Sequence, residues 1–270
     1  MTITAIEPRA NARKTTNGFW WADLQAHDVK AAVEFYGRTL GWEFREEHDA
    51  EGTIVYWTAL LGKQTVAGVG EMPGEAVAGG MPSAWTNYVT VDDAAATCAT
   101  ATQLGGRVLM GPMEVMDQGT MAIVLDPTGA AFGLWQNGRH TGADAVNQPS
   151  TYTWAELYSS DVDQATAFYA ALFGWTAAPM VEGGDYLVLS NDGHQMAGLM
   201  PKPAEMGDAP DAWVTYYGVA DVMAAKAEVT AAGGTVLWGP TQTGPGTTIG
   251  VQDPQGAVVH FIEMEQWDPS

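Results

Sequence analysis

The sequence predicts an α+β protein that contains four β-α-β-β-β modules, grouped as two tandem halves. The first observation behind this prediction is an internal repeat, which is the sequence signature of a duplicated architecture. The segment WADL at 21–24 returns as WAEL at 154–157, and the Asp-Pro-x-Gly segment at 126–129 returns at 253–256. The second observation is that each half carries two helix-like runs, each flanked by short runs of strand-like alternation.

The first module illustrates the pattern. Residues 20–24 alternate in the manner of a strand, and Asp28 is expected to cap a helix that continues through Leu40 and stops at Gly41. Three further strand-like runs follow, at 42–46, 53–61 and 65–70.

The second module begins with the strand-like run at 83–91, and its helix is opened by Asp93 and ended by a pair of glycines. Its remaining strands are expected around Val108, at 121–125 and at 131–136. The second half repeats this scheme from Tyr152 and again from Trp213, so the four modules form two pairs.

We expect the chain to comprise a flexible N-terminal arm at 1–17, a first domain at 18–137, a linker at 138–150 and a second domain at 151–267. The linker assignment rests on a polar, glycine-containing stretch between the halves. The arm lacks the apolar run of a signal peptide, and no segment approaches a membrane span. The sequence therefore predicts a cytoplasmic protein.

Composition narrows the classes of partner. Eleven Lys and Arg residues stand against 32 Asp and Glu residues, for a formal net charge of −21. A surface this acidic repels nucleic-acid phosphates and anionic lipids, so we expect neither a nucleic-acid nor a membrane partner. The single cysteine, Cys98, excludes a disulfide within the chain. The eleven tryptophans favour a protein with large, flat apolar surfaces.

Two short motifs carry a resemblance to a known superfamily. A helix ending in Phe-Tyr and followed by Gly-Trp occurs at 35–42 and again at 168–175, and an Asp-Pro-x-Gly turn precedes the last strand of each half. From residue 18 to residue 267 the chain resembles the vicinal oxygen chelate superfamily. This superfamily includes glyoxalase I, extradiol dioxygenases, fosfomycin-resistance enzymes and bleomycin-resistance proteins. More narrowly, the chain is similar to tandem-domain actinobacterial proteins labelled hydroxylases or glyoxalases in natural-product pathways.

The resemblance implies two glyoxalase-like domains, in each of which two modules pair into an incomplete barrel around the substrate. It also implies where a metal would bind, because members that chelate a metal use three His, Glu or Gln ligands. The corresponding positions here are Trp21, Thr86 and Gly133 in the first half, and Trp154, Val214 and His260 in the second. Only His260 is able to bind a divalent ion, and one imidazole does not hold a metal.

We therefore expect no metal and no other cofactor. The alternative is a divalent-metal site in a shifted register, which would bring in His27, His48 or His194. None of these three has a second ligand at metal-binding spacing.

Two acidic residues are the leading catalytic candidates. Strand alternation places Asp23 on one face with Trp21, and in the second half it places Glu156 on one face with Trp154 and Tyr158. A carboxylate buried in an aromatic-lined cavity is expected to have a raised pKa, in a range useful for acid/base catalysis. The alternative is that each acid accepts a hydrogen bond from a backbone or tryptophan N–H and only holds its strand in place.

His260 is the third catalytic candidate. By alternation it faces the same cavity, and beside Glu156 it would form an acid/base pair in which the carboxylate orients the imidazole. The alternative is a vestigial ligand that is hydrogen-bonded to a tyrosine.

The first half is expected to have a roomier pocket, because Gly133 stands where the second half has the histidine. The substrate-binding residues predicted besides Trp21, Trp154 and Tyr158 are Tyr88, Gly133, Trp135 and Tyr216. Trp135 fits the hydrophobic core equally well, and for Trp85 and Trp213 the core is the preferred assignment.

The sequence thus predicts a metal-independent enzyme for a cyclisation, rearrangement or lyase step on an aromatic or polyketide-like natural-product intermediate. One alternative is a bleomycin-resistance-type protein that binds and sequesters a small molecule. Another is a metal-dependent lyase, dioxygenase or hydroxylase. The partner in each case is a small apolar or aromatic ligand, and the protein is expected to be a monomer or a homodimer.

Overall fold

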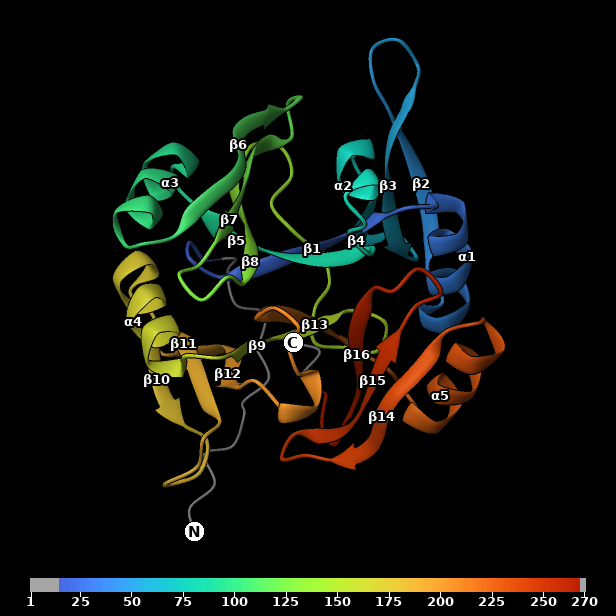
Figure 1. The fold of residues 1–270 in the computed structure, drawn as a ribbon. Helices are drawn as coiled ribbons and strands as arrows, with labels where there is room; N and C mark the ends of the chain where they lie inside the picture. Colours follow the sequence, from blue (N-terminus) through green and yellow to red (C-terminus); the bar gives the residue numbers. More distant parts are fainter. Residues whose placement is uncertain (1–14, 268–270) are drawn as a thin grey trace. The chain divides into compact units, whose positions relative to one another are not determined.

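The computed structural model describes residues 15–267, which form sixteen strands with a few helices (Figure 1). Of the predicted arm at 1–17, residues 1–14 lie outside the described residues. The elements of the first half are β1 (Phe19–Ala26), α1 (Val29–Leu40), β2 (Glu43–His48), β3 (Ile54–Leu61), β4 (Gln64–Glu71), α2 (Gly74–Ala78), β5 (Ala84–Val91), α3 (Ala94–Gln103), β6 (Arg107–Val115), β7 (Gly119–Leu125) and β8 (Ala131–Asn137).

The second half repeats this order, with a short 3-10 helix in place of α2. Its elements are β9 (Tyr152–Ser159), α4 (Val162–Phe173), β10 (Thr176–Pro179), β11 (Leu187–Asn191), β12 (His194–Pro201), η1 (Ala204–Met206), β13 (Ala212–Gly218), α5 (Val222–Ala231), β14 (Thr235–Gln242), β15 (Gly246–Gln252) and β16 (Val258–Met264). The predicted class is confirmed, because each half consists of two β-α-β-β-β modules.

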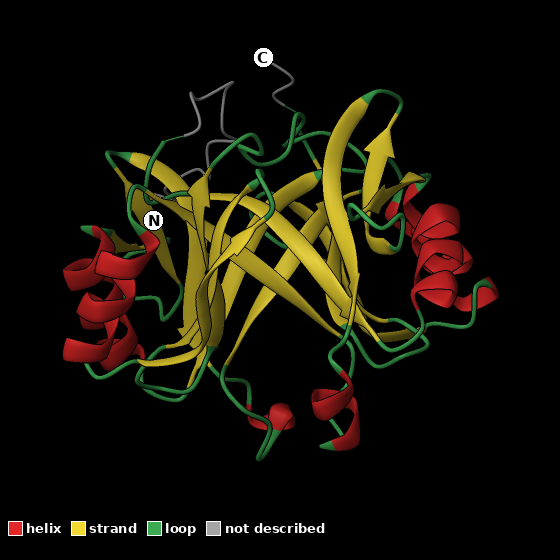
Figure 2. Ribbon diagram, turned by 90° about the horizontal axis from the view of Figure 1, so that it is seen from above, coloured by secondary structure: helices red, strands yellow, loops and turns green. Residues whose placement is uncertain are grey.

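Each half contributes one eight-stranded sheet that does not close on itself. The strand order is β2-β3-β4-β1-β5-β8-β7-β6 in the first sheet and β10-β11-β12-β9-β13-β16-β15-β14 in the second. Figure 2 shows the strands in yellow and the helices in red. In each module the first strand pairs in parallel with the last, for example β5 with β8 and β9 with β12. The other pairs within each module are antiparallel hairpins. Open sheets of this kind agree with the predicted incomplete barrel.

The four long helices begin at aspartates whose side chains accept backbone hydrogen bonds of the first turn. In α1, Asp28 Oδ1 accepts from the Ala31 N–H at 3.1 Å. Helices α1 and α4 both end at a glycine, Gly41 or Gly174, with φ of 70° and 74°. This left-handed conformation favours glycine, so the predicted helix ends are confirmed. The short helices α2 and η1 were not predicted, because they are too short to show a periodic pattern.

By contacts between Cα atoms the chain forms two compact units. Of the described residues, the first unit contains 15–20, 87–141 and 154–214, and the second contains 21–86, 142–153 and 215–267. Each unit therefore combines one module from each half. Helix α3 packs against α4 in the first unit, and α1 packs against α5 in the second.

A buried chain of three side chains joins the two modules of the second unit. The Trp85 Nε1–H donates to Tyr36 Oη at 2.9 Å, and the Tyr36 hydroxyl donates to Asp253 Oδ2 at 3.1 Å. The other carboxylate oxygen of Asp253 accepts from the backbone N–H groups of Gln255 and Ala257. Burial raises the pKa of Asp253, and burial followed by the charge of Asp253 raises the pKa of Tyr36 well above its usual value.

The first unit contains the same chain from the equivalent residues. The Trp213 Nε1–H donates to Tyr169 Oη at 2.7 Å, and the Tyr169 hydroxyl donates to Asp126 Oδ2 at 2.9 Å. Trp85 and Trp213 are buried, so their assignment to the core is confirmed. In both units the tyrosine of a Phe-Tyr helix therefore binds the Asp-Pro-x-Gly turn of the other half.

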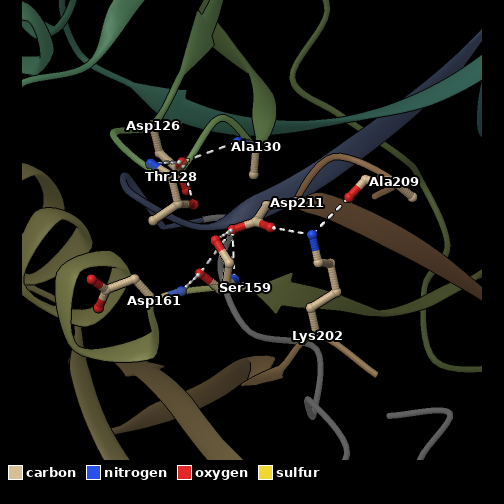
Figure 3. Close-up of polar contacts among 9 residues, drawn as sticks. Asp126, Thr128, Ala130, Ser159, Asp161, Lys202, Ala209 and Asp211 are labelled. Carbon is tan, nitrogen blue, oxygen red and sulfur yellow. Dashed lines mark hydrogen bonds and ion pairs between the residues drawn. The ribbon is translucent and has the colours of Figure 1, made fainter. Parts of the chain in front are cut away.

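A second polar link fixes the start of α4 (Figure 3). The buried Asp211 carboxylate accepts from the backbone N–H and hydroxyl of Ser160, at 2.7 and 2.8 Å, and pairs with Lys202 Nζ at 3.4 Å. Burial opposes ionisation of Asp211, but these contacts keep its pKa below the usual value. In the second unit Gln255 has the corresponding role, because its amide exchanges two hydrogen bonds with the backbone of Asp28.

The segments flanking the halves are also held by hydrogen bonds. The Trp175 indole donates to the Asn17 carbonyl at 2.7 Å, and the Asn191 side chain donates to the Thr16 carbonyl at 2.8 Å. In the stretch predicted as a linker, Asp144 Oδ2 accepts from the backbone N–H and the hydroxyl of Thr65, at 2.9 and 2.8 Å. No helix within residues 15–267 has the length and apolar character to cross a membrane.

Replacing Tyr36 or Tyr169 with Phe removes the hydroxyl that donates to a buried carboxylate. We expect each variant to lower the free energy of unfolding by about 1.5–3 kcal/mol, measured by chemical denaturation. The control is Arg38→Met, which breaks the exposed 2.8 Å ion pair between Arg38 and Glu228 and is expected to cost less than about 1 kcal/mol. Tyrosine variants no less stable than Arg38→Met would show that the hydroxyl does not link the modules.

Candidate functional site

The first candidate site centres on Asp23 in β1, whose side chain is buried. The Trp21 Nε1–H donates to Tyr56 Oη at 3.3 Å, and the Tyr56 hydroxyl donates to Asp23 Oδ2 at 3.2 Å. Tyr56 lies on β3, so two strands contribute to this Trp–Tyr–acid cluster. The cluster places a buried carboxylate next to an indole and a phenol.

The same cluster recurs in the second half around Glu156, which is also buried. The Trp154 Nε1–H donates to Tyr186 Oη at 3.0 Å, and the Tyr186 hydroxyl is hydrogen-bonded to the Glu156 carboxylate. Burial and then the negative charge of Glu156 raise the pKa of Tyr186 well above its usual value. The Tyr186 hydroxyl therefore keeps its proton and acts as the donor. Tyr158, a predicted binding residue, is buried in the same unit and adds to the raised pKa of Tyr186.

A glycine opposite each acid makes room for the tyrosine. Gly68 in β4 is the register partner of Asp23, and Gly198 in β12 is the partner of Glu156. A Cβ atom added at either glycine would overlap the hydroxyl group of Tyr56 or Tyr186. Both glycines are therefore required for the close approach of the tyrosine to the strand backbone.

These tyrosines and glycines were missed by the sequence analysis, although the sequence contains a signal for them. Tyr56 and Tyr186 stand at the same offset, 130 residues, as Gly68 and Gly198. Alternation along β1 and β9 does not place these tyrosines, because the position of Tyr56 on β3 and of Tyr186 just before β11 depends on strand register.

The second module contains three of the predicted binding residues. Tyr88 in β5 and Gly133 in β8 are register partners, and a Cβ atom at Gly133 would overlap the Tyr88 ring. The Tyr88 and Trp135 rings meet edge to face with centroids 6.4 Å apart. The Trp135 indole donates to the His140 carbonyl at 2.9 Å. The space left by the glycine is thus occupied in part by the Tyr88 ring.

In the fourth module His260 fills the equivalent position. Tyr216 in β13 is its register partner, and the two rings are perpendicular with centroids 4.6 Å apart. The ring of Trp238 packs on His260 from β14, at 4.9 Å. His260 is only 2% exposed, and its burial lowers its pKa to about 3. At neutral pH the imidazole is therefore uncharged.

Not all of the predicted site residues fall in one unit. Glu156 belongs to the first unit and His260 to the second, so the predicted acid/base pair of these two residues stays a prediction. Trp21 and Asp23 belong to the second unit, whereas Tyr88, Gly133 and Trp135 belong to the first.

The side chains at the superfamily's metal-ligand positions do not suit a metal. The indole N–H groups of Trp21 and Trp154 are hydrogen-bond donors and not metal ligands, and each donates to a tyrosine hydroxyl. His260 lies between two aromatic rings. Within residues 15–267 no three His, Cys, Asp or Glu side chains gather in a group that could hold a metal ion.

The four modules, their open sheets and the aromatic-lined acid clusters define a tandem α+β protein with two related sites. The chain belongs to the glyoxalase/bleomycin resistance protein/dioxygenase superfamily, whose family model matches residues 18–134 and 151–261. This match confirms the predicted superfamily and its presence in two tandem copies.

The chain matches curated relatives over nearly the whole length of both proteins. The chain is 39% identical over 246 residues to CFP32 of Mycobacterium tuberculosis, which is named a putative glyoxylase. The match covers 90% of this chain and 93% of that protein. It is 31% identical to the anthracycline biosynthesis protein DnrV of Streptomyces peucetius, with 93% and 94% covered. The fold is similar to that of the Mn(II)-bound glyoxalase from Novosphingobium aromaticivorans, with a TM-score of 0.64, 15% identity, and 93% and 83% covered.

Changing Gly198 to Ala introduces a Cβ atom where the Tyr186 hydroxyl now lies. We expect this variant to displace Tyr186 from Glu156 and to cost about 1–3 kcal/mol of stability, measured by thermal unfolding. The control is Gly74→Ala in α2, where a Cβ atom meets nothing within 4 Å. That change should be neutral or slightly stabilising. Equal stability of the two variants would contradict the close packing at Gly198.

The neutral state of His260 is testable by NMR on protein with ¹⁵N-labelled histidine. The folded-state pKa of His260 is about 3, below the ordinary value of 6.5. Between these pH values the unfolded chain therefore protonates the imidazole, whereas the folded protein keeps it neutral. Stability should therefore fall as the pH drops from 6.5 toward 3, and His260→Gln should weaken that dependence. We expect neutral His260 signals at pH 5; titration near pH 6.5 would contradict the burial argument.

Proposed function

We propose that this protein is a metal-independent enzyme that transfers protons on a flat aromatic or polyketide-like intermediate, in a cyclisation, rearrangement or lyase step. The observation that carries the proposal is the duplicated Trp–Tyr–acid cluster, in which Asp23 and Glu156 are each paired with a tyrosine hydroxyl. A carboxylate placed in this way is able to accept a proton from a carbon next to a carbonyl group. The same group then returns the proton to another atom of the substrate.

The tyrosine supports this chemistry by positioning the acid. Its hydroxyl donates to one carboxylate oxygen and receives the indole N–H in return, as in the Trp154–Tyr186–Glu156 set. The carboxylate is thereby held in one orientation. Preorganisation of this kind reduces the reorganisation needed during proton transfer.

The chemistry of the side chains supports the substrate class. Indole and phenol rings surround both acids, and such rings bind flat aromatic molecules well. The relative from Streptomyces peucetius is named for anthracycline biosynthesis, and anthracyclines are flat polycyclic aromatic compounds. A net charge of −21 favours a neutral or cationic ligand over an anionic one.

His260 has a smaller role in the proposed proton transfer than Asp23 and Glu156. With a pKa of about 3 the imidazole is uncharged at neutral pH, so it does not serve there as an imidazolium general acid. It remains available as a hydrogen-bonding or packing group for the ligand. Location in the cytoplasm and a monomeric or homodimeric state remain predictions.

Hydrogen–deuterium exchange tests the proton-transfer step. With 2-acetyl-9,10-anthraquinone in D₂O, the protein is expected to accelerate exchange at the acetyl carbon in the presence of a strong chelator, as followed by mass spectrometry. In at least one half the amide variant, Glu156→Gln or Asp23→Asn, should lower that rate by roughly two to four orders of magnitude, because the amide cannot accept the proton. Glu182→Gln, an exposed loop change, is the control and should leave the rate unaltered.

Two results would contradict the proposal. One is loss of exchange in the chelator that one equivalent of a divalent metal restores. The other is full exchange activity in both amide variants. Binding of the anthraquinone without any accelerated exchange would instead assign the protein to the class that sequesters small molecules.

A further inference from the structure

Trp238 differs from most other tryptophans of the chain. Eight of the eleven tryptophans are buried, whereas Trp238 is 37% exposed. It lies on β14, which ends the strand order of the second sheet (Figure 1). Unlike the eight buried tryptophans, Trp238 is therefore accessible for contact with a ligand.

The Trp238 ring is nevertheless held in place on one side. It packs on His260 with ring centroids 4.9 Å apart and an angle of 80° between the planes. A Cβ atom added at Gly250, on the neighbouring strand β15, would overlap the indole. Glycine at this position therefore allows the ring to lie against the strand backbone. The result is a fixed aromatic surface next to a predicted site residue of the same unit.

The first half keeps apolar side chains at the equivalent positions. The glycine pair at 105–106 returns at 233–234, an offset of 128 residues. At the same offset, Leu109 and Met110 in β6 correspond to Leu237 and Trp238, and all four are exposed. In place of Gly250 the first half has Ile123 at the register position. A methionine is flexible and polarizable, so it adapts to an apolar ligand without offering a flat face.

We propose that Trp238 is a specificity-determining residue, whose exposed indole stacks on a flat, uncharged or cationic polycyclic aromatic ligand. This inference rests on the proposed function, because it names how the ligand of the second half is held. Met110 is the less selective counterpart in the first half. Stacking requires a rigid aromatic face, and the contact with His260 together with the glycine beneath the ring provides it.

Binding of 1,4-dihydroxyanthraquinone, followed by its visible absorbance, tests the inference. Trp238→Phe keeps an aromatic face and should bind within about threefold of the unaltered protein. Trp238→Met copies the first half and should bind about tenfold more weakly, since the stacking contribution is lost. The control is Val77→Ala, an exposed apolar position on α2, which should bind normally. The 2-sulfonate of the same probe should bind more weakly than the neutral compound, because of the acidic surface.

Thermal unfolding of every variant shows whether it is folded before binding is compared. Unchanged affinity in folded Trp238→Met would overturn the role of Trp238. The proposed function would be unaffected by that result, because it is tested by the exchange defect of Glu156→Gln. Failure of the unaltered protein to bind the neutral probe would overturn the inference. Failure to catalyse exchange as well would overturn the proposed function with it.

Discussion

The structure depends on the hydrogen bond between a helix tyrosine and the aspartate of an Asp-Pro-x-Gly turn. A buried carboxylate is costly unless hydrogen-bond donors surround it. The hydroxyl of Tyr36 donates a hydrogen bond to Asp253 in addition to those from the backbone of the Asp253 turn. Because Tyr36 lies in the first half and Asp253 in the second, this hydrogen bond joins a module of one half to a module of the other. Tyr169 and Asp126 form the same bond in the first unit. All four modules therefore depend on one interaction that occurs twice.

The candidate site builds on strands adjoining this link. The turn at Asp253 leads directly into β16, which carries His260, and the helix with Tyr36 follows β1, which carries Trp21 and Asp23. The two halves keep the Trp–Tyr–acid cluster but differ elsewhere. Where the first half has Gly133 under the Tyr88 ring, the second half has a neutral histidine between aromatic rings. One duplicated scaffold thus presents two chemically different surfaces.

Much of the fold could be predicted because its determinants are local. Asp28 and Gly41 specify the ends of α1 through the capping bond and the left-handed φ, and the repeat extends that assignment to α4. The partner of Tyr36 could not be predicted, since each half carries both a helix tyrosine and a turn aspartate. Within the site, Asp23 follows from strand alternation, whereas its contact with Tyr56 depends on the register of β3 and β4. The low pKa of His260 depends on burial by Tyr216 and Trp238, which no spacing along the chain reveals.

The most direct test of this account is the association state of the first half alone, expressed as residues 1–150 and measured by sedimentation equilibrium. In the full chain Tyr36 bonds to Asp253 and Asp126 bonds to Tyr169, so an isolated half lacks both partners. Two copies can restore both bonds by pairing the tyrosine of each with the aspartate of the other. We expect a folded dimer, or a chain that folds only when residues 151–270 are added. A stably folded monomer would contradict it.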